Sequence, residues 1–200
     1  YPLYALSGLI FWNFFNTTIN QVLTSVVARA GVLKSINVPT IIFPISAIAS
    51  SLINLLLSLI PFFILMFFFG FEPSLKSLQF IYILTVFSCF SLGLGLILCA
   101  YNIYFRDVGM LWLTITPALF YFTPIIWQLN DTMIDTGSKM WYIVQLNPIY
   151  HYITAFRTAF YDNEWLSLEQ FCIITILGII VLFVGYRVFN KLEKGFYSHY

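Results

Sequence analysis

The sequence predicts an all-α membrane protein, and its composition is the first reason. Hydrophobic residues make up 60% of the 200 residues and charged residues only 8%, whereas a soluble domain has about 25% charged residues. The mean hydropathy is +0.90. The 22 Phe, 13 Tyr and 5 Trp residues suit lipid and its interfaces. A formal net charge of +1 provides no basic surface for nucleic acid.

Charge-free stretches are the second reason, and they locate the membrane-spanning helices. A charge at the bilayer centre costs roughly 2.5 to 3.5 kcal/mol on insertion scales, so spanning helices avoid charged residues. About 20 apolar residues cross the hydrocarbon core as a helix. The sequence therefore predicts five spans, near residues 3–27, 40–70, 78–104, 108–128 and 167–189.

The basic residues predict the orientation of these spans. Consecutive crossings place alternate loops on opposite sides of the membrane, and the side with more basic residues is cytoplasmic. The richer set of loops holds Arg29, Lys34, Arg106, Arg187, Lys191 and Lys194, and the other set holds Lys76, Lys139 and Arg157. We therefore expect the chain to enter from outside and to end in the cytoplasm, with Arg106 and Asp107 in a tight cytoplasmic turn.

Two of the predicted spans carry a polar stripe at helical spacing. The stripes consist of Asn13, Thr17, Asn20 and Thr24 in the first span and of Ser46, Ser50, Asn54 and Ser58 in the second. Such stripes support close helix packing in a bilayer, and they can also line a polar path. In the third span, the small residues of the segment Ser91 to Gly95 predict a close approach to another helix.

Prolines mark the irregular segments. Pro117 and Pro124 interrupt the fourth span, and a broken helix at membrane depth is tolerated only where protein or a water-filled cavity covers the freed backbone. Further along, Asn147 is a favourable helix cap and Pro148 a favourable first-turn residue. The charge-free part before Arg157 is too short to cross, so this segment is predicted to be a re-entrant or interfacial helix.

The sequence carries little that indicates catalysis. His151 stands between Tyr150 and Tyr152 without an HxxxH or HExxH partner, so interfacial packing is its favoured role. No GxSxG or GxxxxGK[ST] motif occurs, and, apart from Glu169 at the edge of the last one, no acid lies within a predicted span to relay protons. We predict a transport subunit that is not an enzyme and holds no metal or cofactor, so uphill transport would draw its energy from another subunit.

Six segments, in order along the chain, resemble a known family. They read YPLYALSGLIFWNFFNTTINQ, ARAGVLKSINVPTIIFPISAIASSLINLLLSLIP, SLGLGLILCAYNIYFRDVGMLWL, FYFTPIIW, LNPIYHYITAFR and FNKLEKGF. Together they are similar to the membrane subunits of type-2 ABC exporters that move polysaccharides, the permease group for O-antigen, teichoic acid and capsular chains. The resemblance runs through essentially the whole chain.

The resemblance implies a domain organisation and partners. The family permease has six spans with both termini cytoplasmic, preceded by an amphipathic interface helix. Residues 1–200 are therefore expected to be a single transmembrane permease domain that lacks this helix and the first span, in keeping with a start at Tyr1. Two permeases pair as a homodimer in the bacterial inner membrane, and each docks on an ABC nucleotide-binding subunit that holds ATP and Mg²⁺.

The resemblance also implies site residues. The segment Ala28 to Pro39 matches the family's coupling element, and Arg106 with Asp107 matches an "RD" pair on the same side. The implied residues for coupling to the nucleotide-binding subunit are Arg29, Gly31, Lys34, Val38, Pro39, Arg106 and Asp107.

The outer segments and the aromatic residues receive implied roles as well. Two short re-entrant helices shape the exit of the family pore, and the stretches FYFTPIIWQ and NPIYHYITAFR match them, the latter with Asn147, Pro148 and Arg157. Aromatic faces suit sugar rings. The candidate path residues, of which two or three are expected to contact substrate, are Trp12, Phe15, Trp112, Phe120, Tyr121, Phe122 and Trp127.

The functional hypothesis is the permease half of an ATP-driven exporter of a lipid-linked polysaccharide. Two alternatives stay open at this point. One is a type-2 permease for drugs or small lipids. The other is a membrane-embedded acyl- or glycosyltransferase, for which His151 is the best available catalytic residue.

Overall fold

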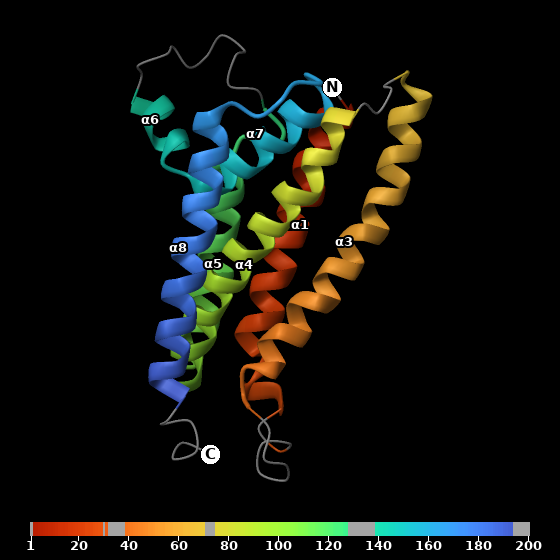
Figure 1. Ribbon diagram of the computed structural model, residues 1–200. Coiled ribbons are helices and arrows are strands. Elements are labelled where there is room, and N and C mark those ends of the chain that lie inside the picture. The colour runs from red at the N-terminus through yellow and green to blue at the C-terminus, as the bar shows by residue number, and fades with distance from the viewer. Residues whose placement is uncertain (1, 30, 32–38, 71–74, 128–138, 194–200) are drawn as a thin grey trace.

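The computed structural model describes residues 2–29, 31, 39–70, 75–127 and 139–193. In this part of the chain, long helices run side by side and shorter helices cover one end of the bundle (Figure 1). The helices are α1 (Pro2–Ser25), α3 (Ile42–Phe68), α4 (Gln79–Tyr104), α5 (Asp107–Phe122), α6 (Lys139–Gln145), α7 (Pro148–Phe160) and α8 (Leu168–Glu193), with 3-10 turns at Val27–Arg29 and Leu75–Leu78. No strand occurs among the described residues, so the all-α prediction is confirmed.

The long helices lie where the five spans were predicted. Three segments are long and apolar enough to cross a membrane, namely Ile42–Phe68, Leu75–Tyr104 and Leu168–Glu193. Helix α1 has 24 residues, about 36 Å at 1.5 Å per residue. Helix α5 has only 16 residues, about 24 Å, which is less than the roughly 30 Å of a bilayer's hydrocarbon core.

The prediction that the fourth span extends to residue 128 is therefore wrong. Helix α5 ends at Phe122, and Thr123 is extended, with φ −93° and ψ 128°. The cause is Pro124, because the ring of a proline disfavours the helical conformation in the residue before it. The predicted interruption at Pro124 is thus confirmed, whereas the predicted interruption at Pro117 is wrong, because α5 continues through Pro117.

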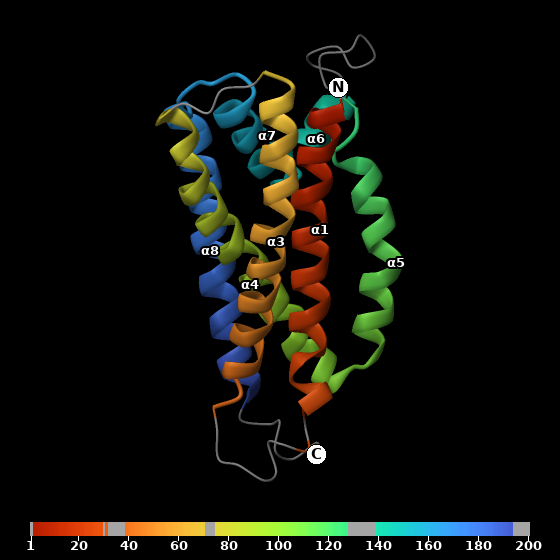
Figure 2. The ribbon, with the colours of Figure 1, turned by 90° about the vertical axis from the view of Figure 1, so that its right-hand side faces the viewer.

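The two ends of the bundle hold alternate connections. The turn after α1, the α4–α5 turn and the end of α8 lie at one end, and α6, α7, the end of α3 and the start of α4 lie at the other (Figures 1 and 2). The start of α1 lies at the α7 end. This arrangement agrees with alternate loops on opposite sides, and we call the end with Arg29 the coupling end and the other the outer end.

Helix α7 lies at the outer end, as the sequence predicted. Asn147 caps it, because its Oδ1 accepts a hydrogen bond from the Ile149 N–H at 3.0 Å, and Pro148 follows in the first turn. The prediction of a second outer helix in FYFTPIIWQ is wrong for its described part, since 123–127 is not helical. The other short helix at this end is α6.

Glycines let α4 and α8 approach closely, which confirms the close packing predicted for Ser91 to Gly95. A Cβ atom added at Gly93 would lie 2.5 Å from the backbone of Leu182, and one added at Gly185 would collide with the Gly93 backbone. Close backbone approach through small residues is the usual means of helix association in a bilayer. Gly185, on α8, was not singled out in the sequence.

Aromatic side chains form the core between α1, α4 and α7. Phe11 and Phe156 have ring centroids 4.5 Å apart, and Phe87 and Tyr152 have centroids 4.9 Å apart. The buried Tyr152 hydroxyl donates to the Ile174 carbonyl at 2.9 Å. Because a buried hydroxyl requires such a partner, this bond fixes α7 against α8.

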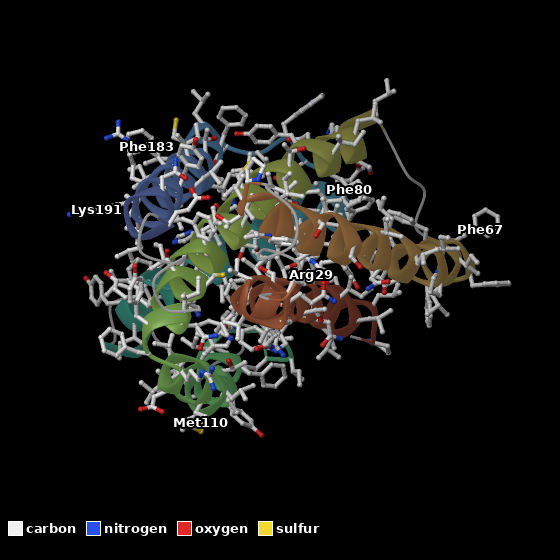
Figure 3. The ribbon with its side chains drawn as sticks, turned by 90° about the horizontal axis from the view of Figure 1, so that it is seen from below. Arg29, Phe67, Phe80, Met110, Phe183 and Lys191 are labelled. Carbon is white, nitrogen blue, oxygen red and sulfur yellow. The ribbon has the colours of Figure 1, made fainter. Side chains whose placement is uncertain are left out.

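Helix α3 diverges from the bundle towards its outer end (Figure 1). Phe67, near the end of α3, lies at the periphery when the bundle is viewed from the coupling end (Figure 3). The outer half of α3 therefore presents apolar side chains, including Phe67 and Phe68, to its surroundings.

Candidate functional site

A groove runs between α1 and α5 at the coupling end. Its volume is about 710 Å³. We call it the α1–α5 groove, and its lining residues are Asn20, Gln21, Leu23, Thr24, Val27, Asn102, Arg106, Gly109, Met110 and Leu113. Amide and hydroxyl side chains come mostly from α1, and apolar side chains come from both walls. The groove is therefore amphipathic.

Asn102 of α4 fixes the two walls of the α1–α5 groove. Its Nδ2 donates to the Leu23 carbonyl at 3.3 Å, and its Oδ1 accepts from the Gly109 N–H at 3.2 Å. The second bond satisfies one of the backbone donors that the first turn of a helix leaves free. Asn102 is buried, so it joins α1 to the start of α5 from behind the groove.

Helix α5 contacts the bundle through little of its surface. Its buried residues are Trp112 and Thr116, whereas Met110 is 64% exposed and Tyr121 76% exposed. In Figure 2, α5 stands beside α1 at the edge of the bundle. Most of α5 is thus open to lipid, to a second chain or to a path between chains.

The two predicted polar stripes face one another in part. A smaller cavity of about 140 Å³ lies between α1 and α3, lined by Ile10, Asn13, Phe14, Thr17, Ser51, Asn54, Leu55 and Ser58. Nearer the coupling end, the Ser51 hydroxyl donates to Gln21 Oε1 at 2.9 Å. The remaining polar residues of both stripes are exposed or half-buried. The stripes therefore pack together and also leave a polar surface on the bundle.

Of the residues predicted for coupling, Arg29 is the best defined. It lies in the turn after α1, where its Nη1 donates to the Ser46 hydroxyl at 3.1 Å and its guanidinium lies 5.6 Å from the centre of the Phe43 ring. Gly31 and Pro39 are exposed near it along the chain. These contacts attach the turn to the first helical turns of α3.

The other coupling residues divide into two groups. Arg106 and Asp107 are exposed at the start of α5, at the same end of the bundle as Arg29. Lys34 and Val38 lie outside the described residues. The coupling role of the whole set stays a prediction.

The end of α8 is bonded to the start of α3, which the sequence did not indicate. Glu193 accepts hydrogen bonds from the Thr40 hydroxyl and, at 3.3 Å, from the Thr40 N–H. In addition, the Tyr104 hydroxyl donates to the Leu192 carbonyl at 2.8 Å. Thr40, which directly follows the predicted coupling segment Ala28 to Pro39, is thus bonded to the end of α8.

The seven candidate path aromatics fall into three classes. Trp12, Phe15 and Trp112 are buried in the core, and Phe15 packs edge-on against Trp112 at 6.1 Å between ring centres. Phe120 and Trp127 are half-buried, whereas Tyr121 and Phe122 are exposed. Packing is thus the visible role of the first three. A substrate role for any of the seven stays a prediction.

Arg157 occupies a different environment from the outer loop that its place in the charge count suggested. It is only 6% exposed, although it lies on an outer helix as predicted. Its Nη1 donates to the Pro124 carbonyl at 3.0 Å, and its Nη2 donates to the carbonyls of Tyr4 at 3.1 Å and Ile125 at 2.7 Å. Its guanidinium also lies over the Tyr4 ring, 3.4 Å from the ring centre.

Arg157 therefore covers the backbone that the end of α5 leaves free. The carbonyls of Pro124 and Ile125 belong to the non-helical segment after α5, and such groups at membrane depth need internal partners. The sequence contains the proline that ends the helix and leaves these carbonyls without helical partners. It does not indicate which side chain binds them, because a backbone carbonyl is the same in every residue. The helical spacing did contain a signal that Arg157 is buried. Arg157 lies next to the core residue Phe156 and four residues after the core residue Ile153, and residues four apart share one face of a helix.

His151 has a structural partner. Its Nε2 lies 2.8 Å from the Gln145 carbonyl, and the side chain is half-buried between α6 and α7. Among the described residues, no group of three His, Cys, Asp or Glu side chains is arranged to hold a metal. The contact with the Gln145 carbonyl gives His151 a packing role, as the sequence favoured.

The sequence comparisons agree with the helical architecture. Over 98% of its length the chain is 29% identical to the O-antigen export system permease protein RfbA of Klebsiella pneumoniae, of which it covers 74%. It is 22% identical to the RfbA protein of Myxococcus xanthus, with 98% and 75% covered. It is also 22% identical to the capsule polysaccharide export inner-membrane protein CtrC of Neisseria meningitidis, over 53% of this chain and 38% of that protein.

A family model identifies the class of membrane protein. The model described as ABC-2 type transporter matches residues 2–161, which includes every described helix except α8. That match covers the α1–α5 groove, the polar stripes and Arg157. The chain belongs to the ABC-2 type transporter family of multi-pass membrane proteins.

Proposed function

We propose that this chain is the permease subunit of an ATP-driven exporter that moves a lipid-linked polysaccharide across the bacterial inner membrane. The relatives named for O-antigen and capsule polysaccharide export support the substrate class. The family supports the transporter role. ATP and Mg²⁺ are assigned to a separate nucleotide-binding subunit.

The polar surface of α1 and α3 is the observation that carries the proposal. Asn13, Asn54 and Ser58 are exposed in a chain whose helices are otherwise strongly apolar. Exposed amides are unfavourable against lipid, but they suit a glycan, which presents many hydroxyl groups and no fixed charge. We therefore assign this surface to the translocation path, closed by a second copy of the chain.

The coupling end supplies the proposed link to ATP hydrolysis. Arg29 is exposed and attached to Ser46 of α3, so a movement of the turn after α1 is transmitted to the helix that carries the second polar stripe. The assignment of Lys34 and Val38 to this link rests on the resemblance alone. Arg106 and Asp107 lie at the same end and complete the proposed docking surface.

Deletion of the gene, in an organism whose neighbouring genes encode glycosyltransferases, tests the proposal. We expect surface glycan to disappear and lipid-linked glycan to accumulate at the cytoplasmic face, with both effects reversed by the wild-type gene. Normal surface glycan in the deletion strain, together with increased sensitivity to small amphipathic drugs, would assign the chain to drug export instead.

A further inference from the structure

Thr40 lies in a turn that leads directly into α3. The N–H groups of Ile42 and Phe43 donate to the carbonyls of Pro39 and Thr40, each at 3.2 Å, and so form this turn. Thr40 is fully buried, and a buried N–H or hydroxyl group requires a hydrogen-bond acceptor. The residue just before the helix is Ile41, whose side chain makes no capping hydrogen bond.

Glu193, at the end of α8, supplies the acceptor. Its Oε1 accepts hydrogen bonds from the Thr40 hydroxyl and, at 3.3 Å, from the Thr40 N–H. A carboxylate also complements the positive N-terminal end of a helix, and the first turn of α3 contains no acidic residue of its own. One side chain of α8 thus caps the start of α3 from a different helix.

Further contacts hold the end of α8 in place beside this bond. Phe43, in the first turn of α3, and Phe189, on α8, belong to one buried cluster. Residues four apart lie on one face of a helix, so Phe189 and Glu193 face α3 together. The Tyr104 hydroxyl of α4 donates to the Leu192 carbonyl at 2.8 Å. The end of α8 therefore joins the start of α3 to the end of α4.

The predicted coupling segment, Ala28 to Pro39, is attached to the same part of α3. Near its beginning, Arg29 donates to the Ser46 hydroxyl of α3. At its end, the next residue is Thr40, which Glu193 holds. A shift of the start of α3 would therefore move both attachments of the segment.

We propose that Glu193 is a positioning residue for coupling, which holds the start of α3, and with it the coupling segment, where the ATPase subunit acts. Its role in coupling rests on the proposed function, whereas its effect on the position of α3 does not. Both bonds to Thr40 use one oxygen atom, which an amide also provides. Glu193→Gln should therefore keep the position, and Glu193→Leu, of similar size but without an acceptor, should lose it.

Hydrogen exchange tests the position of α3. The full-length protein in lipid nanodiscs is followed by mass spectrometry, with the amides of residues 40–46 as the readout. We expect about tenfold faster exchange there in Glu193→Leu, because loss of buried hydrogen bonds increases the population of the open form. Glu193→Gln should exchange as the wild type does. The matched control Glu169→Leu, which removes an exposed acid at the other end of α8, should also leave these amides unchanged.

The ratio of glycan exported to ATP hydrolysed tests the role in coupling. In proteoliposomes with the proposed nucleotide-binding subunit, Glu193→Leu should lower this ratio about fivefold or more while ATP hydrolysis continues. Glu193→Gln and Glu169→Leu should keep the wild-type ratio.

A cross-link separates positioning from a general loss of stability. Thr40→Cys and Glu193→Cys are combined with Cys172→Ser, which removes the exposed native cysteine. Before cross-linking, this variant should couple poorly. A short bifunctional thiol reagent that joins the two new cysteines should restore the ratio.

Three results would overturn the inference. One is unchanged exchange of residues 40–46 in Glu193→Leu. Another is a wild-type ratio of export to hydrolysis in Glu193→Leu, and the third is a cross-linked variant whose ratio stays low. Absence of glycan movement by the wild type would instead refute the proposed function, and the exchange measurement would still decide whether Glu193 positions α3.

Discussion

Arg157 of α7 donates a 2.7 Å hydrogen bond to the carbonyl of Ile125, in the segment that follows α5. The same guanidinium reaches the Tyr4 carbonyl at the start of α1. One buried side chain thereby joins α1, the end of α5 and α7 at the outer end of the bundle. The exit side of the proposed path is held in shape by a cation bound to backbone carbonyls.

Replacement of Arg157 by Ala is expected to destabilise the outer end. The buried carbonyls of Pro124 and Ile125 would lose a donor, and each such loss costs about 1 to 3 kcal/mol, whereas the Tyr4 carbonyl keeps the Ser7 hydroxyl. We expect a fall in stability of about 3 kcal/mol or more, and faster proteolysis within 123–127. Arg157→Lys should recover only part of the loss, because an ammonium cannot reproduce the planar arrangement of guanidinium donors.

The thermal midpoint in lipid nanodiscs and limited proteolysis measure these effects. Arg187→Ala serves as the control, because Arg187 is exposed. A midpoint for Arg157→Ala equal to that of Arg187→Ala would show that the carbonyl contacts contribute no stability.

Gly8 is expected to be essential for the position of Arg157. A Cβ atom at Gly8 would lie 2.7 Å from Arg157 Nη2 and 2.9 Å from the Ile125 carbonyl oxygen. Gly8→Ala should therefore destabilise the protein by displacing both the guanidinium and the backbone of Ile125 to which it is bonded. In a double-mutant cycle, Gly8→Ala should cost less once Arg157 is already Ala, with the part due to the Ile125 carbonyl remaining. Fully additive effects would contradict this coupling.

Gly93 is expected to set the distance between α4 and α8. Its added Cβ would meet the Leu182 backbone at 2.5 Å, and forced separation of packed elements costs typically about 1 to 3 kcal/mol. Gly93→Ala should lower the thermal midpoint. Gly31→Ala, where an added Cβ meets nothing within 4 Å, should not, and equal midpoints for the two variants would refute close packing as the role of Gly93.

Charge reversal at Arg29 and Lys34 is expected to uncouple ATP hydrolysis from transport. Arg29 connects the turn after α1 to Ser46, and the proposed partner acts on this turn. The double variant Arg29→Glu, Lys34→Glu should insert normally and hydrolyse ATP with its partner while export falls at least about tenfold. Ser46→Ala isolates the hydrogen bond from the charge, and a normal ratio of export to hydrolysis in the double variant would remove the coupling assignment.

The sequence predicted those features that depend on local patterns. Charge-free stretches located the long helices, the Asn147-Pro148 pair located the start of α7, and Ser91 to Gly95 indicated close packing. In each case the residues that carry the pattern belong to the helix whose position or packing they predict.

The features that the sequence did not predict depend on distant partners. The bond between Glu193 and Thr40 joins residues 153 positions apart, and neither residue type is unusual at its position. Arg157 was placed on the outer re-entrant helix and counted with the outer basic residues, but its burial against backbone carbonyls was not predicted. The break at Pro124 was predicted, but the span was drawn to residue 128 because hydropathy continues through the proline, although the helix does not.

Reconstitution into proteoliposomes tests the central claim most directly. The full-length chain is combined with its proposed nucleotide-binding subunit, and lipid-linked glycan that reaches the opposite leaflet is measured with and without ATP. We predict glycan movement only when ATP and the second subunit are both present. Glycan movement without the ATPase subunit, or ATP-driven movement of a small solute with no glycan movement, would contradict the account.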